Sequence, residues 1–360
     1  MANVGSGSET GPGPARRLVP APAGRTRPGR GPTIEDVAAA AGVSRGTVSR
    51  ALNGGRLVSP EAAAAVRKAV KQTGYVVNHN ARSLVTRRSN AVAFVLSESH
   101  DLLFEDPNFG VLLRVATESL AAAQMTLFLT LNGGGDARDR LLNYIRGGYL
   151  DGVLLVSTHG DDPLFRLLET SGVPTVVCGR PIGHESALSY VQADDRGGAE
   201  LAVAHLVDRG HRQIAIIPGP LDTAGAMDRL AGYQRVLGSR ARPELAEEAS
   251  AYSHRAGEEA MARLLARVPG LDAVFAASDL LAAGAISALH RAGRRVPDDV
   301  AVAGFDDSRL ALTTDPPLTT VRQSVDQLAE EMVHLLLRVI DGAAPRAVQL
   351  PTRLIVRASA

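Results

Sequence analysis

The chain has 360 residues, of which 45% are hydrophobic and 4% aromatic, and its formal net charge is +1. This length is too great for one hydrophobic core, so we expect two or three domains. No run approaches the roughly 18 apolar residues of a membrane span, and the N-terminal residues lack the apolar stretch of a secretory signal, so we expect no secretory leader. The single cysteine, Cys178, excludes an intramolecular disulfide and favours a reducing compartment. We therefore expect a cytoplasmic protein.

The near-zero net charge hides a strong asymmetry along the chain. Residues 1–90 carry 14 Lys and Arg against 4 Asp and Glu, whereas residues 91–360 carry 25 against 34. A basic head on an acidic body is typical of one nucleic-acid-binding module attached to a body that does not touch DNA.

Residues 1–30 are rich in Gly, Pro, Ser and Ala and include five arginines. Such a segment cannot bury enough apolar surface to order itself, so we expect a disordered basic arm. It either adds non-specific attraction to phosphates or is a passive extension. The sequence leaves both alternatives open.

Residues 31–77 predict three short helices with a tight turn between the first two. Thr33 and Asp36 match a capping box, Gly42 suits the left-handed position that ends a helix, and Ser44 begins the second helix. Ser59, followed by Pro60, begins the third. The apolar residues at helical spacing form one small core, which we expect to contain Val37, Ala41, Val43, Val48, Leu52, Val66 and Val70.

This pattern is a helix-turn-helix, whose second helix enters the major groove of DNA. The core positions leave the N-terminal end of that helix facing outward, with residues Arg45, Gly46, Thr47, Ser49 and Arg50. Because arginine can bind guanine through two hydrogen bonds, Arg45 and Arg50 are candidates for reading bases. A generic three-helix bundle is the alternative.

After residue 90 the sequence alternates between apolar runs and amphipathic helices. The first half has expected strands at 91–96, 125–131, 153–156 and 173–177, with helices at 110–123, 137–146 and 163–170. The second half has strands at 214–217, 273–276 and 300–305, an extended run near 250–252, and helices at 196–209, 224–237, 256–268 and 280–292. Continuous apolar strands between helices predict two doubly wound parallel sheets. Ligands of such sheets bind at the carboxyl ends of strands, and the space between the halves is the expected site.

Several motifs together resemble the LacI/GalR family of transcription regulators. The head contains Thr33-Ile34-x-Asp36-Val37-Ala38, Ala41-Gly42-Val43-Ser44, Thr47-Val48-Ser49-Arg50-x-Leu52-Asn53 and Ala81-Arg82-Ser83-Leu84. The body contains Ala193-Asp194-Asp195-x-Gly197-Gly198, Gly304-Phe305-Asp306-Asp307 and Pro316-Pro317-Leu318-Thr319-Thr320-Val321-Arg322-Gln323. The resemblance covers residues 33–357 and implies a small all-α helix-turn-helix head on an α/β body similar to periplasmic binding proteins.

For the head, the resemblance implies contacts to DNA from both the helix-turn-helix and a hinge within residues 78–90. The hinge helix would fold on operator DNA and insert Leu84 into the minor groove, a known way of kinking DNA. Two residues depart from the family pattern: Val77 replaces a common proline, and Gly46 replaces a side chain that usually reads bases. The second departure implies that Arg45 is the main residue for reading bases, followed by Arg50. The expected DNA-binding residues are Thr33, Ser44, Arg45, Gly46, Thr47, Ser49, Arg50, Asn53, Asn78, Ala81, Arg82 and Leu84.

For the body, the resemblance implies a first subdomain of residues 91–190 with 324–341. The second subdomain would contain residues 191–316 with the tail 347–360. A sugar site needs charged hydrogen-bonding groups and an aromatic wall. The expected effector-binding residues are Phe109, Arg229, Tyr252, Ser278, Asp279, Asp306 and Gln323. For Asp306, Arg229 and Tyr252 the alternatives are a helix cap, a surface ion pair and a core residue.

We therefore predict a regulator, expected to be a repressor, that binds double-stranded operator DNA as a homodimer, with a tetramer left open. A sugar or nucleoside-like effector would change its DNA affinity. No cofactor and no metal are expected, because the histidines and the one cysteine show no metal-ligand spacing. The rival from another class is a two-lobed solute-binding receptor. An enzyme is disfavoured because no nucleophile-base pattern is present.

The hinge interpretation predicts that Leu84→Ala weakens specific operator binding and leaves the body folded. Fluorescence anisotropy with operator DNA measures the first effect, and the thermal unfolding curve checks the second. An unchanged operator affinity would rule out insertion of Leu84 into the minor groove.

Overall fold

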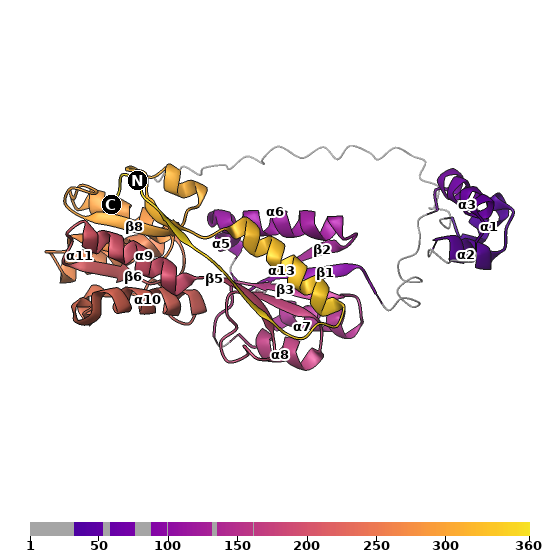
Figure 1. The fold of residues 1–360 in the computed structure, drawn as a ribbon, viewed down its shortest axis with the longest axis horizontal. Coiled ribbons are helices and arrows are strands. Elements are labelled where there is room, and N and C mark those ends of the chain that lie inside the picture. Colours follow the sequence, from indigo (N-terminus) through magenta and orange to yellow (C-terminus); the bar gives the residue numbers. More distant parts are fainter. Residues whose placement is uncertain (1–31, 53–57, 76–87, 99, 132–134, 161) are drawn as a thin grey trace, which may run out of the picture. The chain divides into compact units, whose positions relative to one another are not determined.

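The computed structural model describes residues 32–52, 58–75, 88–98, 100–131, 135–160 and 162–360. It divides into two compact units, Met1–His79 and Asn80–Ala360, which we call the head and the body (Figure 1). Within the described residues, no helix is long and apolar enough to cross a membrane.

The head contains three helices: α1 (Ile34–Ala41), α2 (Arg45–Leu52) and α3 (Pro60–Thr73). The capping box forms as expected, with the Thr33 side chain and the Asp36 side chain each bonding the other's backbone amide. Gly42 ends α1 at φ 65°, a left-handed conformation that glycine adopts without steric cost. Val37, Val48, Val66 and Ala69 form the buried core, and the other expected core residues pack against it.

The first subdomain of the body is a six-stranded parallel sheet in the order β10-β5-β4-β3-β1-β2. The strands are β1 (Ala91–Leu96), β2 (Thr126–Leu131), β3 (Gly152–Val156), β4 (Thr175–Cys178), β5 (Ser189–Ala193) and β10 (Ala347–Leu350). The helices that accompany them are α5 (His100–Glu105), α6 (Pro107–Ala122), α7 (Gly135–Arg146), α8 (Leu164–Ser171) and α13 (Val325–Ile340). Helices α6 and α13 share one apolar core with one face of this sheet (Figure 1).

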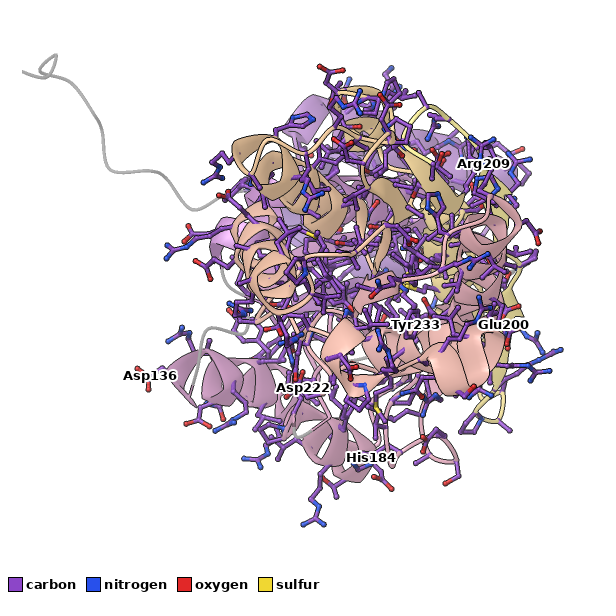
Figure 2. All side chains as sticks on the ribbon, turned by 90° about the vertical axis from the view of Figure 1, so that its left-hand side faces the viewer. Asp136, His184, Glu200, Arg209, Asp222 and Tyr233 are labelled. Carbon is purple, nitrogen blue, oxygen red and sulfur yellow. The ribbon has the colours of Figure 1, made fainter. Side chains whose placement is uncertain are left out.

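The second subdomain has five strands in the order β11-β9-β8-β7-β6, of which β11 is antiparallel. They are β6 (Ile214–Ile217), β7 (Ala273–Ala276), β8 (Ala301–Asp306), β9 (Thr319–Arg322) and β11 (Arg353–Ile355). Its α-helices are α9 (Asp195–Asp208), α10 (Ala224–Leu237), α11 (His254–Arg267) and α12 (Asp279–Arg291), and short 3-10 turns cover 238–240, 243–245 and 309–312. The buried Tyr233 of α10 fixes that helix to the sheet by donating to the Ile214 carbonyl oxygen at 2.8 Å (Figure 2).

The chain passes between the subdomains three times. It crosses from β5 to α9, from β9 to α13, and from β10 to β11 (Figure 1). The first and third crossings touch: Asp194 N donates to the Leu350 carbonyl oxygen at 2.8 Å, and Thr352 Oγ1 donates to the Asp194 carbonyl oxygen at 3.1 Å. The three connections together form the joint between the two subdomains.

The expected course of the tail was wrong in one part. Residues 347–350 were assigned to the second subdomain, but β10 pairs in parallel with β5 at the edge of the first sheet. Exposed and half-buried residues alternate along β10, and this explains the pairing, because Val348 and Leu350 pack onto the apolar core that α6 and α13 share with the first sheet. The tail reaches the second sheet only at β11. The run near 250–252 also forms no strand.

Helices α11 and α12 approach closely because glycine lies at their contact. A Cβ added to Gly284 would lie 2.1 Å from the His254 carbonyl oxygen and 2.7 Å from Glu258 N, both backbone atoms. Backbone atoms cannot move aside as a flexible side chain does, so the two helices would have to separate.

We predict that Gly284→Ala destabilises the body by about 1–3 kcal/mol, the usual cost of overpacking. Gly110→Ala on α6 is the matched control, because nothing lies within 4 Å of a Cβ at Gly110. Alanine there should stabilise the helix by about 0.5–1 kcal/mol. Thermal unfolding followed by circular dichroism measures both, and equal melting temperatures for the two variants would contradict the prediction.

Candidate DNA-binding face and ligand cleft

The described part of the head presents a polar face at the start of α2. Arg45, Gly46 and Arg50 are exposed, Thr47 and Ser49 are half-buried, and Val48 between them is buried in the core. Ser44 caps the helix, since its Oγ accepts from Thr47 N at 3.1 Å. Arg50 extends back over this turn, with Nη2 at 3.5 Å from Thr47 Oγ1.

Arg45, the main candidate for base reading, forms an exposed ion pair in this structure. Its Nε lies 3.3 Å from Glu35 Oε1 on α1, and both side chains are more than half exposed. An exposed pair of this kind contributes about 0–1 kcal/mol. Arg45 can therefore leave Glu35 for a base edge at little cost.

Five of the expected DNA contacts lie outside the described residues: Asn53, Asn78, Ala81, Arg82 and Leu84. Thr33 serves as the N-cap of α1. The assignment of individual residues to DNA contacts stays a prediction.

In the body, a cavity of about 190 Å³ lies between the two subdomains. Six of the seven expected effector-binding residues line it: Phe109, Arg229, Tyr252, Ser278, Asp306 and Gln323. They come from α6 of the first subdomain, from four parts of the second, and from the crossing between β9 and α13. The fold thus brings together residues up to 214 positions apart in the sequence.

Arg229 is the best-anchored side chain in the cavity and is 7% exposed. Its Nε and Nη2 both contact Asp195 Oδ1 at 2.8 Å, and Nη1 donates to the Ala277 carbonyl oxygen. Its guanidinium lies over the Phe305 ring, with Cζ 3.8 Å from the ring centroid. Burial acts to lower the pKa of Arg229, but the surrounding groups, chiefly Asp195 and also Tyr252 and Asp306, together outweigh it and the pKa is raised. This is a buried pair and not the surface pair of the alternative interpretation.

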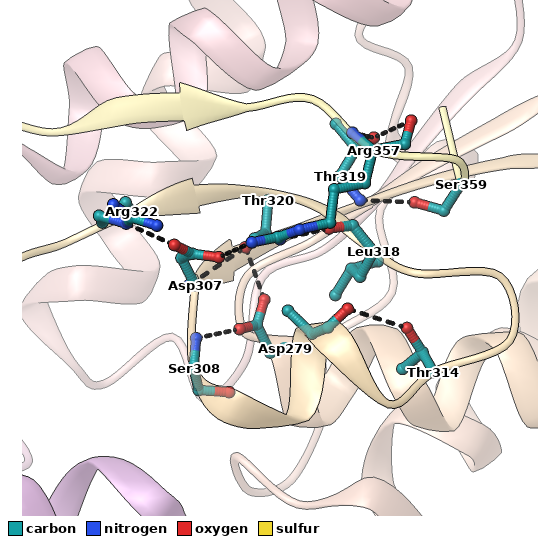
Figure 3. A network of polar contacts seen from close by, with 11 residues as sticks. Asp279, Asp307, Ser308, Thr314, Leu318, Thr319, Thr320, Arg322, Arg357 and Ser359 are labelled. Atoms are coloured by element: carbon teal, nitrogen blue, oxygen red, sulfur yellow. Dashed lines mark hydrogen bonds and ion pairs between the residues drawn. The ribbon is translucent and has the colours of Figure 1, made fainter.

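Asp306 reaches the cavity through a strained turn at the end of β8. Asp306 and Asp307 have backbone φ values of 114° and 55°, which residues other than glycine rarely adopt. Such strain persists where surrounding contacts enforce it. Here Gln323 Nε2 donates to Asp306 Oδ1 at 2.6 Å, while Arg322 and Arg357 pair with Asp307 (Figure 3).

Burial raises the pKa of Asp306 well above its usual value, and the charge of Arg229 opposes this only in part. Asp306 is therefore held in place by its hydrogen bond, and the charge of Arg229 offsets only part of the cost of burying it. That is the arrangement expected of a group that accepts or donates hydrogen bonds to a ligand.

Asp279 does not line the cavity, unlike the other expected residues. It is 1% exposed, and its two carboxylate oxygens accept from Ser308 N at 2.7 Å and Thr320 Oγ1 at 2.6 Å (Figure 3). Burial raises its pKa to about 7. Asp279 thus stabilises the turn after β8 by accepting hydrogen bonds from it and from β9. Its neighbour Ser278 caps α12 by accepting from Leu281 N at 3.1 Å.

Two aromatic residues form opposing walls. Phe109 belongs to the first apolar core and Tyr252 packs against the core of the second subdomain. Tyr252 also lies 3.4 Å from Thr223 through its hydroxyl, so its ring packs inward while its polar end reaches the cavity. Tyr252 is therefore both a residue that packs on the core and a residue that lines the cavity.

Sequence reasoning missed two acidic residues of the cavity. Asp194 caps α9 by accepting from Gly197 N at 3.1 Å, and the next residue, Asp195, is the partner of Arg229. Asp106 caps α6 and lines the cavity; burial raises its pKa to about 6. The Asp-Pro pair at 106–107 is a helix-start signal, which identifies Asp106 as a cap and not as a cavity residue. Within the described residues, no group of three or more His, Cys, Asp or Glu is arranged to hold a metal ion.

The rim of the cavity is closed by contacts between the subdomains. Gly160 N donates to the Asp222 carbonyl oxygen at 2.7 Å, and His159 Nδ1 lies 2.8 Å from Asp222 Oδ2. Nearby, Arg180 Nη2 contacts both carboxylate oxygens of Asp228 at 3.0 and 3.1 Å.

The architecture defines a class: a helix-turn-helix head joined to a two-subdomain body with a ligand cleft. Comparison with known proteins agrees with this class. The model of bacterial regulatory proteins of the lacI family matches residues 33–78, and that of the periplasmic binding protein-like domain matches residues 203–360.

Two relatives extend over almost the whole chain. The HTH-type transcriptional regulator CelR of Thermobifida fusca is 45% identical over 337 residues, covering 92% of this chain and 98% of that protein. The ribose operon repressor of Escherichia coli K12 is 34% identical over 336 residues, covering 91% and 99%.

Solved structures agree with the sequence relatives. A CelR–cellobiose complex has a TM-score of 0.73 at 41% identity, covering 91% of this chain and all of that one. The Lac repressor dimer bound to operator and the anti-inducer ONPF has a TM-score of 0.80 at 26% identity, covering 92% and 99%. The chain belongs to the LacI family of bacterial regulatory proteins and is a DNA-binding transcription regulator.

The rim contact of His159 predicts a pH dependence. Its hydrogen bond to Glu98 is the largest cause that raises the pKa of His159 to about 9, and Asp222 adds to it. Because the folded-state pKa is raised, the stabilisation is complete below the unfolded pKa of about 6.5 and is lost as pH rises through about 9. The melting temperature of wild type minus that of His159→Gln should therefore shrink between pH 6.5 and 9.

The control is His334→Gln on α13, whose imidazole is 73% exposed. Its melting temperature should follow the wild-type pH profile. A wild-type minus His159→Gln difference that is constant from pH 6 to 10 would contradict the role of the His159 charge.

Proposed function

We propose that this regulator is a repressor whose affinity for operator DNA is set by a sugar bound in the cavity between the subdomains. The observation that carries the proposal is the buried Arg229, which is held by Asp195, stacked on Phe305 and faces the same cavity as Asp306 and Gln323. Charged groups in fixed positions bind vicinal hydroxyls strongly, and the flanking aromatic residues supply an apolar surface for a sugar ring.

The first candidate for the ligand is cellobiose. CelR, which shares 41% of its residues in the solved complex, is bound there to cellobiose. A nucleoside-like ligand is the second candidate, because the aromatic residues Phe109 and Tyr252 also line the cavity.

The route from the cavity to DNA runs through the body's three crossings. Asp195 follows the first crossing, and Gln323 lies in the second. We propose that a ligand contacting both subdomains changes their relative angle, and that this change alters how a homodimer binds a near-palindromic operator. The ligand shifts DNA affinity only by the difference in its own affinity for the two states.

The rival function is a solute-binding receptor that uses the same body. The exposed face at the start of α2 favours DNA binding, and the relatives are regulators. The relatives also argue against an enzyme. We propose that the protein acts in the cytoplasm, associated with the nucleoid when bound to DNA.

The test is fluorescence anisotropy of the purified full chain with DNA from its own upstream intergenic region, at physiological salt and with scrambled competitor DNA. Each titration is repeated with cellobiose, other sugars and nucleosides. We expect specific binding that cellobiose changes at least fivefold. Arg229→Lys should abolish the response to sugar and leave the DNA affinity of the sugar-free protein in place. A response to nucleosides alone would replace the sugar assignment, and no response to any ligand would contradict ligand control.

A further inference from the structure

Five charged side chains line the cavity: Asp106, Arg180, Asp195, Arg229 and Asp306. Three are acidic and two are basic. The charges that can interact with a ligand are those that are not already paired within the protein.

The donors of Arg229 are largely used by the protein. A guanidinium has five N–H groups. Its Nε and Nη2 are directed at Asp195, and one N–H of Nη1 is directed at Ala277. At most two N–H groups remain, one on each terminal nitrogen. Two separate donors suit hydroxyl oxygens, but the charge that would pair with an oxyanion is already matched by Asp195.

The second cation is also paired. Arg180 contacts both carboxylate oxygens of Asp228, and its Nη1 lies 3.6 Å from Glu185 Oε1. Its charge is therefore matched by two carboxylates, as that of Arg229 is matched by Asp195.

The remaining acids have no such partner. Neither Asp106 nor Asp306 forms an ion pair within the described part of the chain. Both line the cavity, one from each subdomain, and the charge of Asp106 contributes to raising the pKa of Asp306. A buried anion is costly without a paired cation, and a ligand anion here would find both Arg229 and Arg180 already paired.

Most of the helix N-termini at the cavity are already capped by the protein. Helices α6, α9, α10, α12 and α13 begin at or beside it, and a helix N-terminus usually attracts anions. In four of them a side chain caps the first turn: Asp106 accepts from Asn108 N, Asp194 from Gly197 N, Thr223 from Ala226 N, and Ser278 from Leu281 N. In α13 the N-cap Ser324 makes no such bond. At the four capped helices an added oxyanion would have to compete with these caps.

We propose that the cavity selects uncharged, hydroxyl-bearing ligands and rejects phosphorylated or carboxylated ones, and that Asp106 from the first subdomain is a specificity-determining residue in this selection. This inference rests on the proposed function, because it concerns the same sugar site. It divides the sugars into two chemical classes: a free disaccharide binds, whereas the same disaccharide made anionic by a phosphate ester is excluded.

The experiment is isothermal titration of the full chain with cellobiose and with cellobiose phosphorylated at a primary hydroxyl. We expect cellobiose to bind at least tenfold more tightly than its phosphate. In Asp106→Asn, we expect the ratio of the two affinities to fall at least tenfold, because an amide keeps the shape of the carboxylate and removes its charge. The matched control is Asp139→Asn, an equal loss of charge at an exposed position of α7, which should leave the ratio unchanged.

The outcomes separate the inference from the proposed function. Equal binding of cellobiose and its phosphate by wild type would overturn the inference and leave the sugar site standing. A ratio that is the same in wild type and Asp106→Asn would overturn the role of Asp106. Binding of neither sugar, in a protein that responds to another ligand class, would overturn the proposed sugar function and with it this inference.

Discussion

The ligand cleft depends on one buried interaction, the pair between Arg229 and Asp195. The pair joins α10 to the first turn of α9, and the contacts of Arg229 with Ala277 and Phe305 tie in the ends of β7 and β8. A buried ion pair is weak evidence for stability, because the cost of removing two charges from water offsets much of their attraction. Its position at the carboxyl ends of the strands indicates a functional reason instead: the pair holds a guanidinium in one orientation in the cavity where we propose that the ligand binds.

The same constraint links the cleft to the joint between the subdomains. Asp195 is one residue beyond Asp194, which bonds the third crossing through its backbone, and Gln323 in the second crossing donates to Asp306. Residues that line the cavity are therefore part of, or adjacent to, the segments that must twist when the subdomains move. Closure at the rim adds contacts from His159 and Arg180, which span the two subdomains and have ordinary hydrogen-bond distances. Under the proposed function, a ligand in the cavity would contact residues of the joint directly, so no separate chain of residues is needed to link ligand binding to movement of the subdomains.

The parts of the fold that could be predicted were those with a strong local signal. The apolar runs at 214–217 and 273–276 and the helix at 224–237 have the expected bounds, and the caps of the head follow from Thr33, Gly42 and Ser59. Strands β5 and β9 were missed because Ser189–Ala193 and Thr319–Arg322 contain polar residues that mask the apolar pattern. The edge position of β10 was misassigned because pairing partners depend on the whole sheet and leave little trace in four residues.

For the cavity, the residues named from motifs came together in space, except for Asp279, whose carboxylate faces the turn after β8. Asp195 and Asp106 could not be recognised from their own neighbourhoods. Each lies at a helix start, where an acid is common for local reasons, and only the folded chain places Asp195 beside Arg229, which is 34 positions later.

The central claim is that ligand and DNA binding are energetically coupled, and reciprocity tests it most directly. The affinity of the full chain for cellobiose would be measured by titration, once for the free protein and once for its complex with operator DNA. Thermodynamic linkage requires that the two cellobiose affinities differ by the same factor by which cellobiose changes operator affinity. We predict a factor of about five or more, with the same value from both directions. Equal cellobiose affinity in the free and operator-bound protein would contradict the account.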